Sequence, residues 1–177
     1  MTKPLYKYFT GIPHIYAGEH PSIVKDRVSN CERIEQLMNE GFTDFFDLTE
    51  KFELSSYTQW LRPDNLYTNF PIKNLSVPIS IEDTYKLIQT ISEISLQGNG
   101  RKVYIHCYGG VGRTGMIVAC LLSYYYHDYD YECVMGRFQE AYKNYTKSAY
   151  MNAPETTTQR EFIKQLIQFM KSEKNKI

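Results

Sequence analysis

The sequence has no net charge, no long apolar run and few cysteines. Twenty Lys and Arg residues balance twenty Asp and Glu residues, so no long-range field favours nucleic acid or an anionic membrane surface. No apolar segment approaches the roughly 20 residues of a membrane-spanning helix. Residues 1–10 also lack the apolar core of a signal peptide. We therefore expect a soluble, cytoplasmic protein with no nucleic-acid partner and no membrane insertion.

The cysteines are too few and too scattered for a disulfide scaffold or a C-x-x-C metal or redox motif. They are Cys31, Cys107, Cys120 and Cys133. We expect no metal and no other cofactor. Three of them, all but Cys107, fall on predicted helical faces and are interpreted as packing residues.

The length of 177 residues fits one domain, so we expect residues 1–177 to form a single unit. Apolar periodicity and turn residues predict helices from Asn30, from Ser80, around 116–122, and over about 131–145 and 155–170. They predict strands near 14–17, 42–48, 66–72 and 102–106, the first within a loop-rich stretch over residues 1–30. Helices that alternate with buried strands indicate an α/β fold with a central, mainly parallel sheet flanked by helices.

The segment 106–115 carries the chemistry. It follows a short β-branched run, contains a glycine-rich turn and precedes an almost wholly apolar stretch. A thiol at the end of a strand, just before a helix, faces backbone N–H groups and the positive end of the helix dipole. Cysteines in such places can have pKa values of roughly 3.5 to 7.5 instead of about 8.5. Cys107 is therefore predicted to be a nucleophile at neutral pH.

The residues after Cys107 are suited to bind phosphate. Glycines remove side chains from the concave side of the turn and permit positive φ, so that N–H groups can converge on phosphate oxygens. Arg113 can add two parallel hydrogen bonds from its planar guanidinium. The predicted phosphate-binding residues are Tyr108, Gly109, Gly110, Val111, Gly112 and Arg113.

Three other interpretations of this loop are weaker. A Walker A loop requires Lys where Arg113 stands. The glycines at 110, 112 and 115 match a dinucleotide-binding spacing, but the acidic residues about 20 positions later lie in a turn-like tyrosine tract. A buried strand-end cysteine would need neither the glycines nor the arginine.

The motif His106-Cys107-(five residues)-Arg113-Thr114-Gly115 resembles the active-site loop of the protein tyrosine phosphatase superfamily, in its compact dual-specificity form. The resemblance implies that fold, and a phosphocysteine intermediate that water hydrolyses. It also implies that the Thr114 hydroxyl helps Cys107 to depart and that His106 supports the thiolate. A histidine at a buried strand end is equally well explained as a satisfied core residue.

The resemblance also points to a missing general acid. In the dual-specificity branch, an Asp on a loop roughly thirty residues before the cysteine protonates the leaving group, and general acids typically contribute about 10²- to 10⁴-fold. The matching stretch here is residues 70–78, with Asn74 at the acid position. An amide can form a hydrogen bond to the leaving oxygen but does not protonate it.

Three explanations of Asn74 stay open. The protein is a substrate trap or a phosphate-binding pseudophosphatase; another carboxylate replaces the Asp; or the substrate has a good leaving group such as a phenol. Asp83 is already explained as a first-turn residue of the helix that Ser80 caps. Asp64 lies too far upstream of Cys107.

The predicted activity is hydrolysis of phosphomonoesters on proteins, phosphotyrosine above all and also phosphoserine or phosphothreonine. Members of the superfamily that act on inositol phosphates often carry extra basic residues in the loop, and no Lys or Arg precedes Arg113 here. A phosphorylated protein is thus favoured over a phosphoinositide. Gln159 resembles the residue that positions water in related phosphatases, although the neighbouring Pro154 and Glu155 fit an ordinary helix start.

Overall fold

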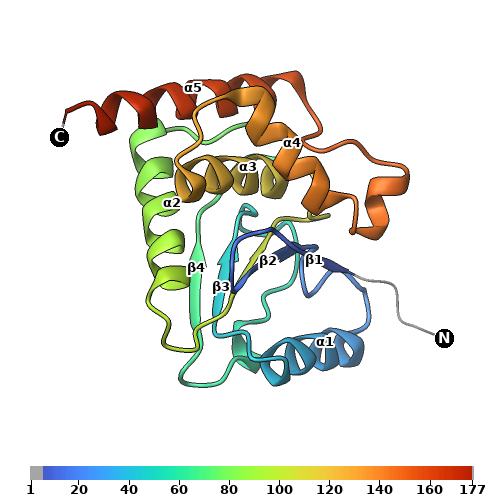
Figure 1. Cartoon of the computed structure of the whole chain (residues 1–177). Coiled ribbons are helices and arrows are strands. Elements are labelled where there is room, and N and C mark those ends of the chain that lie inside the picture. The colour runs from blue at the N-terminus through green and yellow to red at the C-terminus, as the bar shows by residue number, and fades with distance from the viewer. Residues whose placement is uncertain (1–5, 177) are drawn as a thin grey trace.

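The computed structural model describes residues 6–176, so part of the expectation for residues 1–10 lies outside the described residues. The elements alternate along the chain (Figure 1). They are β1 (Lys7–Phe9), β2 (Ile15–Gly18), α1 (Arg27–Asn39), β3 (Asp44–Asp47), η1 (Thr58–Trp60), β4 (Leu66–Asn69), α2 (Ile81–Leu96), β5 (Val103–His106), α3 (Gly112–Tyr126), α4 (Tyr131–Tyr142), η2 (Thr146–Ala149) and α5 (Thr157–Lys174).

The strands form one sheet in the order β1-β2-β5-β3-β4, and all neighbouring pairs except β1–β2 are parallel. The predicted α/β class with a mainly parallel sheet is therefore confirmed. The last residue of the central strand β5, His106, is in register with Gly18 of β2 and Asp47 of β3. The carboxyl ends of these three strands thus lie side by side, at the edge where open α/β sheets bind ligands.

The prediction of one strand within residues 1–30 was wrong, because β1 adds a second. This strand has only three residues and pairs antiparallel with β2 at one edge of the sheet. Such a short segment, followed by Gly11, carries no alternating pattern that the sequence alone could reveal.

Two apolar clusters pack on opposite faces of the sheet. The side chains of β5 alternate between them, as the two-residue period of a strand requires. Val103 and Ile105 join a cluster with α2, α3, α4 and α5, whereas Tyr104 joins one with α1. Figure 1 shows α1 on one side of the sheet and the other four α-helices of the described chain on the other. Cys107 belongs to the first cluster, so its sulfur lies on the α3 side.

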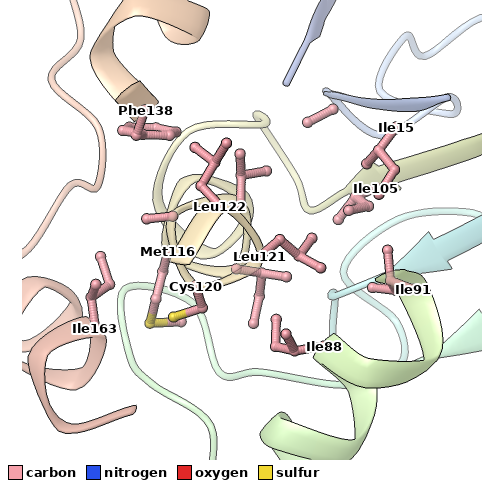
Figure 2. Packing of buried hydrophobic residues seen from close by; sticks show 14 of the residues in the cluster. Ile15, Ile88, Ile91, Ile105, Met116, Cys120, Leu121, Leu122, Phe138 and Ile163 are labelled. Atoms are coloured by element: carbon pink, nitrogen blue, oxygen red, sulfur yellow. The ribbon is translucent and has the colours of Figure 1, made fainter. Parts of the chain in front are cut away.

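Helix α3 is the centre of the larger cluster, with every residue from Gly112 to Ser123 buried. Figure 2 shows its side chains pointing outward toward Ile88 and Ile91 of α2, Ile163 of α5 and Phe138 of α4. Full burial of such a side chain contributes about 1.5–3 kcal/mol. The helix whose N-terminus bears the predicted loop is therefore firmly fixed on all sides.

The helix ends largely follow predicted capping signals. Ser80 accepts a hydrogen bond from the N–H of Asp83, as expected, and α2 begins directly after it. Helix α1 begins at Arg27, before the predicted Asn30, because Asp26 accepts from two N–H groups of the first turn. Helix α5 begins after Thr156, which forms a capping box with Gln159.

All four cysteines are free, and Cys120 is buried as predicted. Cys133 is exposed on α4, so its interpretation as a packing residue was wrong. It lies in the first turn next to the capping Asp130, where the helix faces solvent. Within residues 6–176, no helix combines the length and apolar character that crossing a membrane requires.

Candidate active site

A pocket of about 300 Å³ opens over Cys107, where β5 runs into α3. The Cys107 residue is only 3% exposed. The structure brings together here most residues of the predicted site, from segments that are far apart in the chain. The predicted residues that line the pocket are Asn74, Cys107, Tyr108, Gly109, Gly112, Arg113 and Gln159. His106, Val111 and Thr114 are completely buried next to it.

The turn between Cys107 and α3 is held against the end of β2. Gly110 has a φ of +73°, and a Cβ atom there would lie 2.3 Å from the carbonyl carbon of Gly18. No side chain larger than hydrogen fits at that distance. The carbonyl of Gly109 accepts hydrogen bonds from the Tyr145 hydroxyl and from Lys147 Nζ, both at 2.9 Å. These contacts direct the carbonyl away, which suits a turn that presents its N–H groups to an anion.

Arg113 is 2% exposed and is held by Glu53. Its Nη1 and Nη2 donate to the two carboxylate oxygens of Glu53 at 2.6 and 2.8 Å, and Nη1 also donates to the Ile72 carbonyl at 2.8 Å. Although burial opposes the ionised carboxylate, the bonds from Arg113 lower the pKa of Glu53. Three of the five guanidinium N–H donors are thus occupied within the described chain. The other two, on Nε and Nη2, share the side-on edge that can form a fork to a phosphate.

His106 points toward the α1 side of the sheet. Its Nε2 lies 2.6 Å from the Tyr57 hydroxyl, and its Nδ1 lies 3.3 Å from the Cys107 carbonyl oxygen. Burial lowers the pKa of His106 to about 3, against the opposing effect of Asp47. The ring is therefore neutral at pH 7. It can donate from Nδ1 to the carbonyl while Nε2 accepts from Tyr57, which fixes the backbone of Cys107.

Asp47 connects His106 to His20. Its carboxylate lies 3.8 Å from His106 Nδ1 and 3.7 Å from His20 Nε2. Burial opposes its charge, but the nearby His20 and His106 rings and the hydrogen bond from the Thr49 hydroxyl hold the pKa of Asp47 well below its usual range. The three donor groups lie within 4.8 Å of one another, a spacing that a cation could bridge. Because Asp47 already accepts from Thr49 and Tyr67, we interpret the cluster as support for His106.

Thr114 lies in the first turn of α3 and is fully buried. Its hydroxyl has no hydrogen-bond partner among residues 6–176. Buried hydroxyls are normally satisfied, so an unpartnered one in the first turn after the predicted phosphate-binding loop leaves room for a ligand or a reacting group as its partner.

The rim of the pocket joins the segment 70–78 to the start of α5. Asn74 is exposed and lines the pocket, as predicted for the acid position. Gln159 is fully buried. Its Oε1 accepts from the N–H groups of Glu155 and Thr156, and its Nε2 donates to the Ser76 carbonyl at 3.3 Å. These bonds give Gln159 a structural role, while its predicted contact with water stays a prediction.

Sequence reasoning missed three charged residues of this site. Glu53 holds Arg113, Lys147 lines the pocket and pairs with Glu19 at 3.1 Å, and Glu155 accepts from the N–H of Gly112 at 3.1 Å. Glu53 and Lys147 lie in irregular or 3₁₀ segments without a motif of their own. In the sequence, Glu155 fits an ordinary helix start and nothing more. Its place directly after Pro154 gives no sign of contact with a loop 43 positions away.

Comparison with known proteins identifies the family of the chain. The family model described as Swiss Army Knife protein, DSP-PTPase phosphatase domain (PTP-SAK) matches residues 22–170. The "Putative tyrosine phosphatase 067L" of Invertebrate iridescent virus 3 is 36% identical over 94 residues, 52% of this chain and 38% of that protein. Cyclin-dependent kinase inhibitor 3 of Sus scrofa is 37% identical over 110 residues, 56% of this chain and 49% of that protein. This chain thus spans less than half the length of either relative.

Among solved structures, kinase associated phosphatase with its catalytic-site cysteine replaced by serine superimposes with a TM-score of 0.73. The match covers 97% of this chain and 99% of that one at 19% sequence identity, so it shows a shared fold. The fold, the pocket at the sheet edge and the family match over most of the sequence lead to one conclusion: the chain belongs to the PTP-SAK family of dual-specificity-type protein tyrosine phosphatase domains.

Proposed function

We propose that the protein is a cysteine-dependent protein phosphatase that hydrolyses phosphotyrosine, and also phosphoserine or phosphothreonine, through a phosphocysteine intermediate. The observation that carries the proposal is the position of Cys107. It lines a pocket directly after β5, one turn before the N-terminus of α3, and Arg113 of that helix lines the same pocket. A cysteine sulfur placed there can attack the phosphorus atom of a phosphate that the turn and Arg113 hold.

The proposed roles follow from the contacts. Cys107 Sγ attacks the phosphorus atom and forms the phosphocysteine. The N–H groups of residues 108–113 and the side-on edge of Arg113 bind the phosphate oxygens, and Glu53 positions that guanidinium. His106 fixes the backbone of Cys107, and the unpartnered Thr114 hydroxyl stabilises the thiolate as it departs in the second step.

A protein substrate is supported by a second groove of about 1140 Å³. Ile23 and Tyr108 line both this groove and the Cys107 pocket, so the two adjoin. Arg27 and Trp60 line the groove, and arginine and aromatic residues are enriched at protein-binding surfaces. The four free cysteines fit a reducing compartment, and we propose that the protein acts in the cytoplasm.

Hydrolysis of p-nitrophenyl phosphate tests the proposal. We expect turnover by the unaltered chain, none by Cys107→Ser, and unchanged turnover by Cys133→Ser, which replaces an exposed cysteine outside the site. Rapid acid quenching should trap phosphate on Cys107. Binding of a phosphotyrosine peptide without turnover of any substrate would instead support a pseudophosphatase that captures phosphate beside Asn74. Faster hydrolysis of a soluble phosphoinositide than of the phosphopeptide would favour a lipid substrate.

A further inference from the structure

The pocket over Cys107 has one carboxylic acid among its lining residues in the described part of the chain, and that residue is Glu155. Asn74 lines the pocket too, but its amide does not protonate an alcohol or phenol. Asp83 is occupied elsewhere, because its N–H donates to Ser80 and its carboxylate pairs with Lys86 at 3.3 Å. The carboxylic acid of the pocket therefore comes from the segment just before α5 and not from the 70–78 loop.

The main chain of Glu155 is fixed while its side chain is accessible. Its N–H donates to Gln159 Oε1 at 3.0 Å, and Gln159 in turn donates to the Ser76 carbonyl. Glu155 is thereby tied to the loop that normally supplies the acid. The residue itself is exposed, so its carboxylate can move without disturbing the core.

The carboxylate of Glu155 contacts a group that a phosphate would use. Its Oε1 accepts the N–H of Gly112 at 3.1 Å, and that N–H belongs to the predicted phosphate-binding loop. A phosphate in the pocket would take this hydrogen bond and leave the carboxyl group beside it, at the rim. The negative charge of the phosphate favours the protonated form of a neighbouring carboxyl, which is the form that a general acid requires.

We propose that Glu155 is the general acid of this phosphatase and performs the proton transfer that Asn74 cannot. The inference rests on the proposed function. In the first step the Cys107 Sγ–P bond forms, the bond from phosphorus to the leaving oxygen breaks, and the Glu155 proton passes to that oxygen. An alcohol or phenol leaves, and Glu155 remains as a carboxylate.

The second step restores the starting state. The Glu155 carboxylate removes a proton from water, the water oxygen attacks phosphorus, and the Sγ–P bond breaks. Inorganic phosphate departs, Cys107 is again a thiolate and Glu155 is again protonated. No further reactant is needed, and one residue serves as acid and then as base.

The test compares three leaving groups of rising basicity: p-nitrophenol, the phenol of tyrosine with a pKa of about 10, and the alcohol of serine. Glu155→Gln keeps an oxygen that can accept from Gly112 but has no proton to transfer. We expect kcat to fall about 10²-fold or more for phosphotyrosine, more still for phosphoserine, and least for p-nitrophenyl phosphate. Glu161→Gln, a change at an exposed position in the first turns of α5, should alter none of these rates.

The other outcomes are distinct. Equal losses on all three substrates would give Glu155 a structural role and overturn the inference alone. Tighter inhibition by inorganic phosphate together with faster phosphotyrosine turnover would show that Glu155 only competes for Gly112, and would also overturn it. A leaving-group-dependent loss in Asp83→Asn and not in Glu155→Gln would transfer the role to Asp83. Absence of Cys107-dependent turnover on every substrate would overturn the proposed function and this inference together.

Discussion

The floor and the rim of the Cys107 pocket are built in opposite ways. The floor comes from one continuous segment, 106–115, whose thiol and guanidinium residues are almost fully buried. The rim comes from the 70–78 loop, Lys147 and the start of α5, and both Asn74 and Glu155 are exposed there. A floor made of consecutive residues leaves little freedom in spacing. A rim assembled from separate segments can take its general acid from any of them. We therefore expect substitutions in the floor to have large effects on activity or stability, and substitutions in the rim to have graded effects.

After loss of the Cys107 nucleophile itself, the largest effect is expected for Arg113→Lys. Lysine keeps the positive charge but cannot hold Glu53 with two parallel bonds and offer a second fork to phosphate. We expect kcat/KM for p-nitrophenyl phosphate to fall about 10²- to 10³-fold, with weaker inhibition by inorganic phosphate. An activity within a few-fold of the unaltered chain would mean that the floor needs only charge, and the proposed role of the guanidinium fork would have to be abandoned.

Two adjacent glycines give a matched pair in the floor. Gly110→Ala places a Cβ atom 2.3 Å from the Gly18 backbone at positive φ, whereas in Gly109→Ala the nearest atom is the mobile end of Lys147, at 3.3 Å. Strain of this kind costs roughly 1–3 kcal/mol. We expect urea unfolding to show that loss for Gly110→Ala and little change for Gly109→Ala. Equal stabilities would show that the loop moves freely away from β2.

The difference between the floor and the rim also explains which parts of the site could be predicted from the sequence. The loop was predictable because its chemistry depends on neighbours in sequence: a strand end, three glycines and an arginine six positions after the cysteine. Asn74 was reached by resemblance, and it does line the pocket. Glu53 and Glu155 were not predictable, because their contacts with Arg113 and Gly112 span 60 and 43 positions and arise only when the sheet and helices pack. Strand β1 was missed for a related reason, because only its pairing with β2 identifies it as a strand.

A smaller effect at the floor should appear as a pH dependence of stability. The pKa of His106 falls from 6.5 to about 3 on folding. Below pH 6.5 the unfolded chain binds a proton that the folded chain does not, so the free energy of unfolding decreases as pH falls. The limit is about 1.4 kcal/mol per pH unit for one group. His106→Asn should reduce this slope in urea unfolding between pH 7 and 5, above the range in which the lowered pKa values of Asp47 and Glu53 matter.

The exposed His127 provides the control for that slope. His127 ends α3 with a φ of 52°, a conformation that asparagine tolerates. His127→Asn should therefore leave the pH dependence unchanged. If both variants keep the slope of the unaltered chain, His106 is not the group that resists protonation, and the acid-sensitive element lies elsewhere in the floor.

The smallest effect, and a gain, is expected at the rim for Asn74→Asp. A carboxylic acid there would add a proton donor beside one that already acts, so we expect phosphotyrosine turnover to rise by only about tenfold, less than the roughly 10²- to 10⁴-fold that a first general acid contributes. Hydrolysis of p-nitrophenyl phosphate should rise less, because its leaving group needs no proton. In the Glu155→Gln background the same change should give a larger gain, since the new acid would then be the main donor. If Asn74→Asp leaves the ratio of phosphotyrosine to p-nitrophenyl phosphate hydrolysis unchanged in both backgrounds, position 74 is not an acid position. An equal gain in phosphotyrosine turnover in both backgrounds would mean that positions 74 and 155 transfer protons independently. The rim would then hold two separate proton donors, and Glu155 would not be a replacement for an acid at position 74.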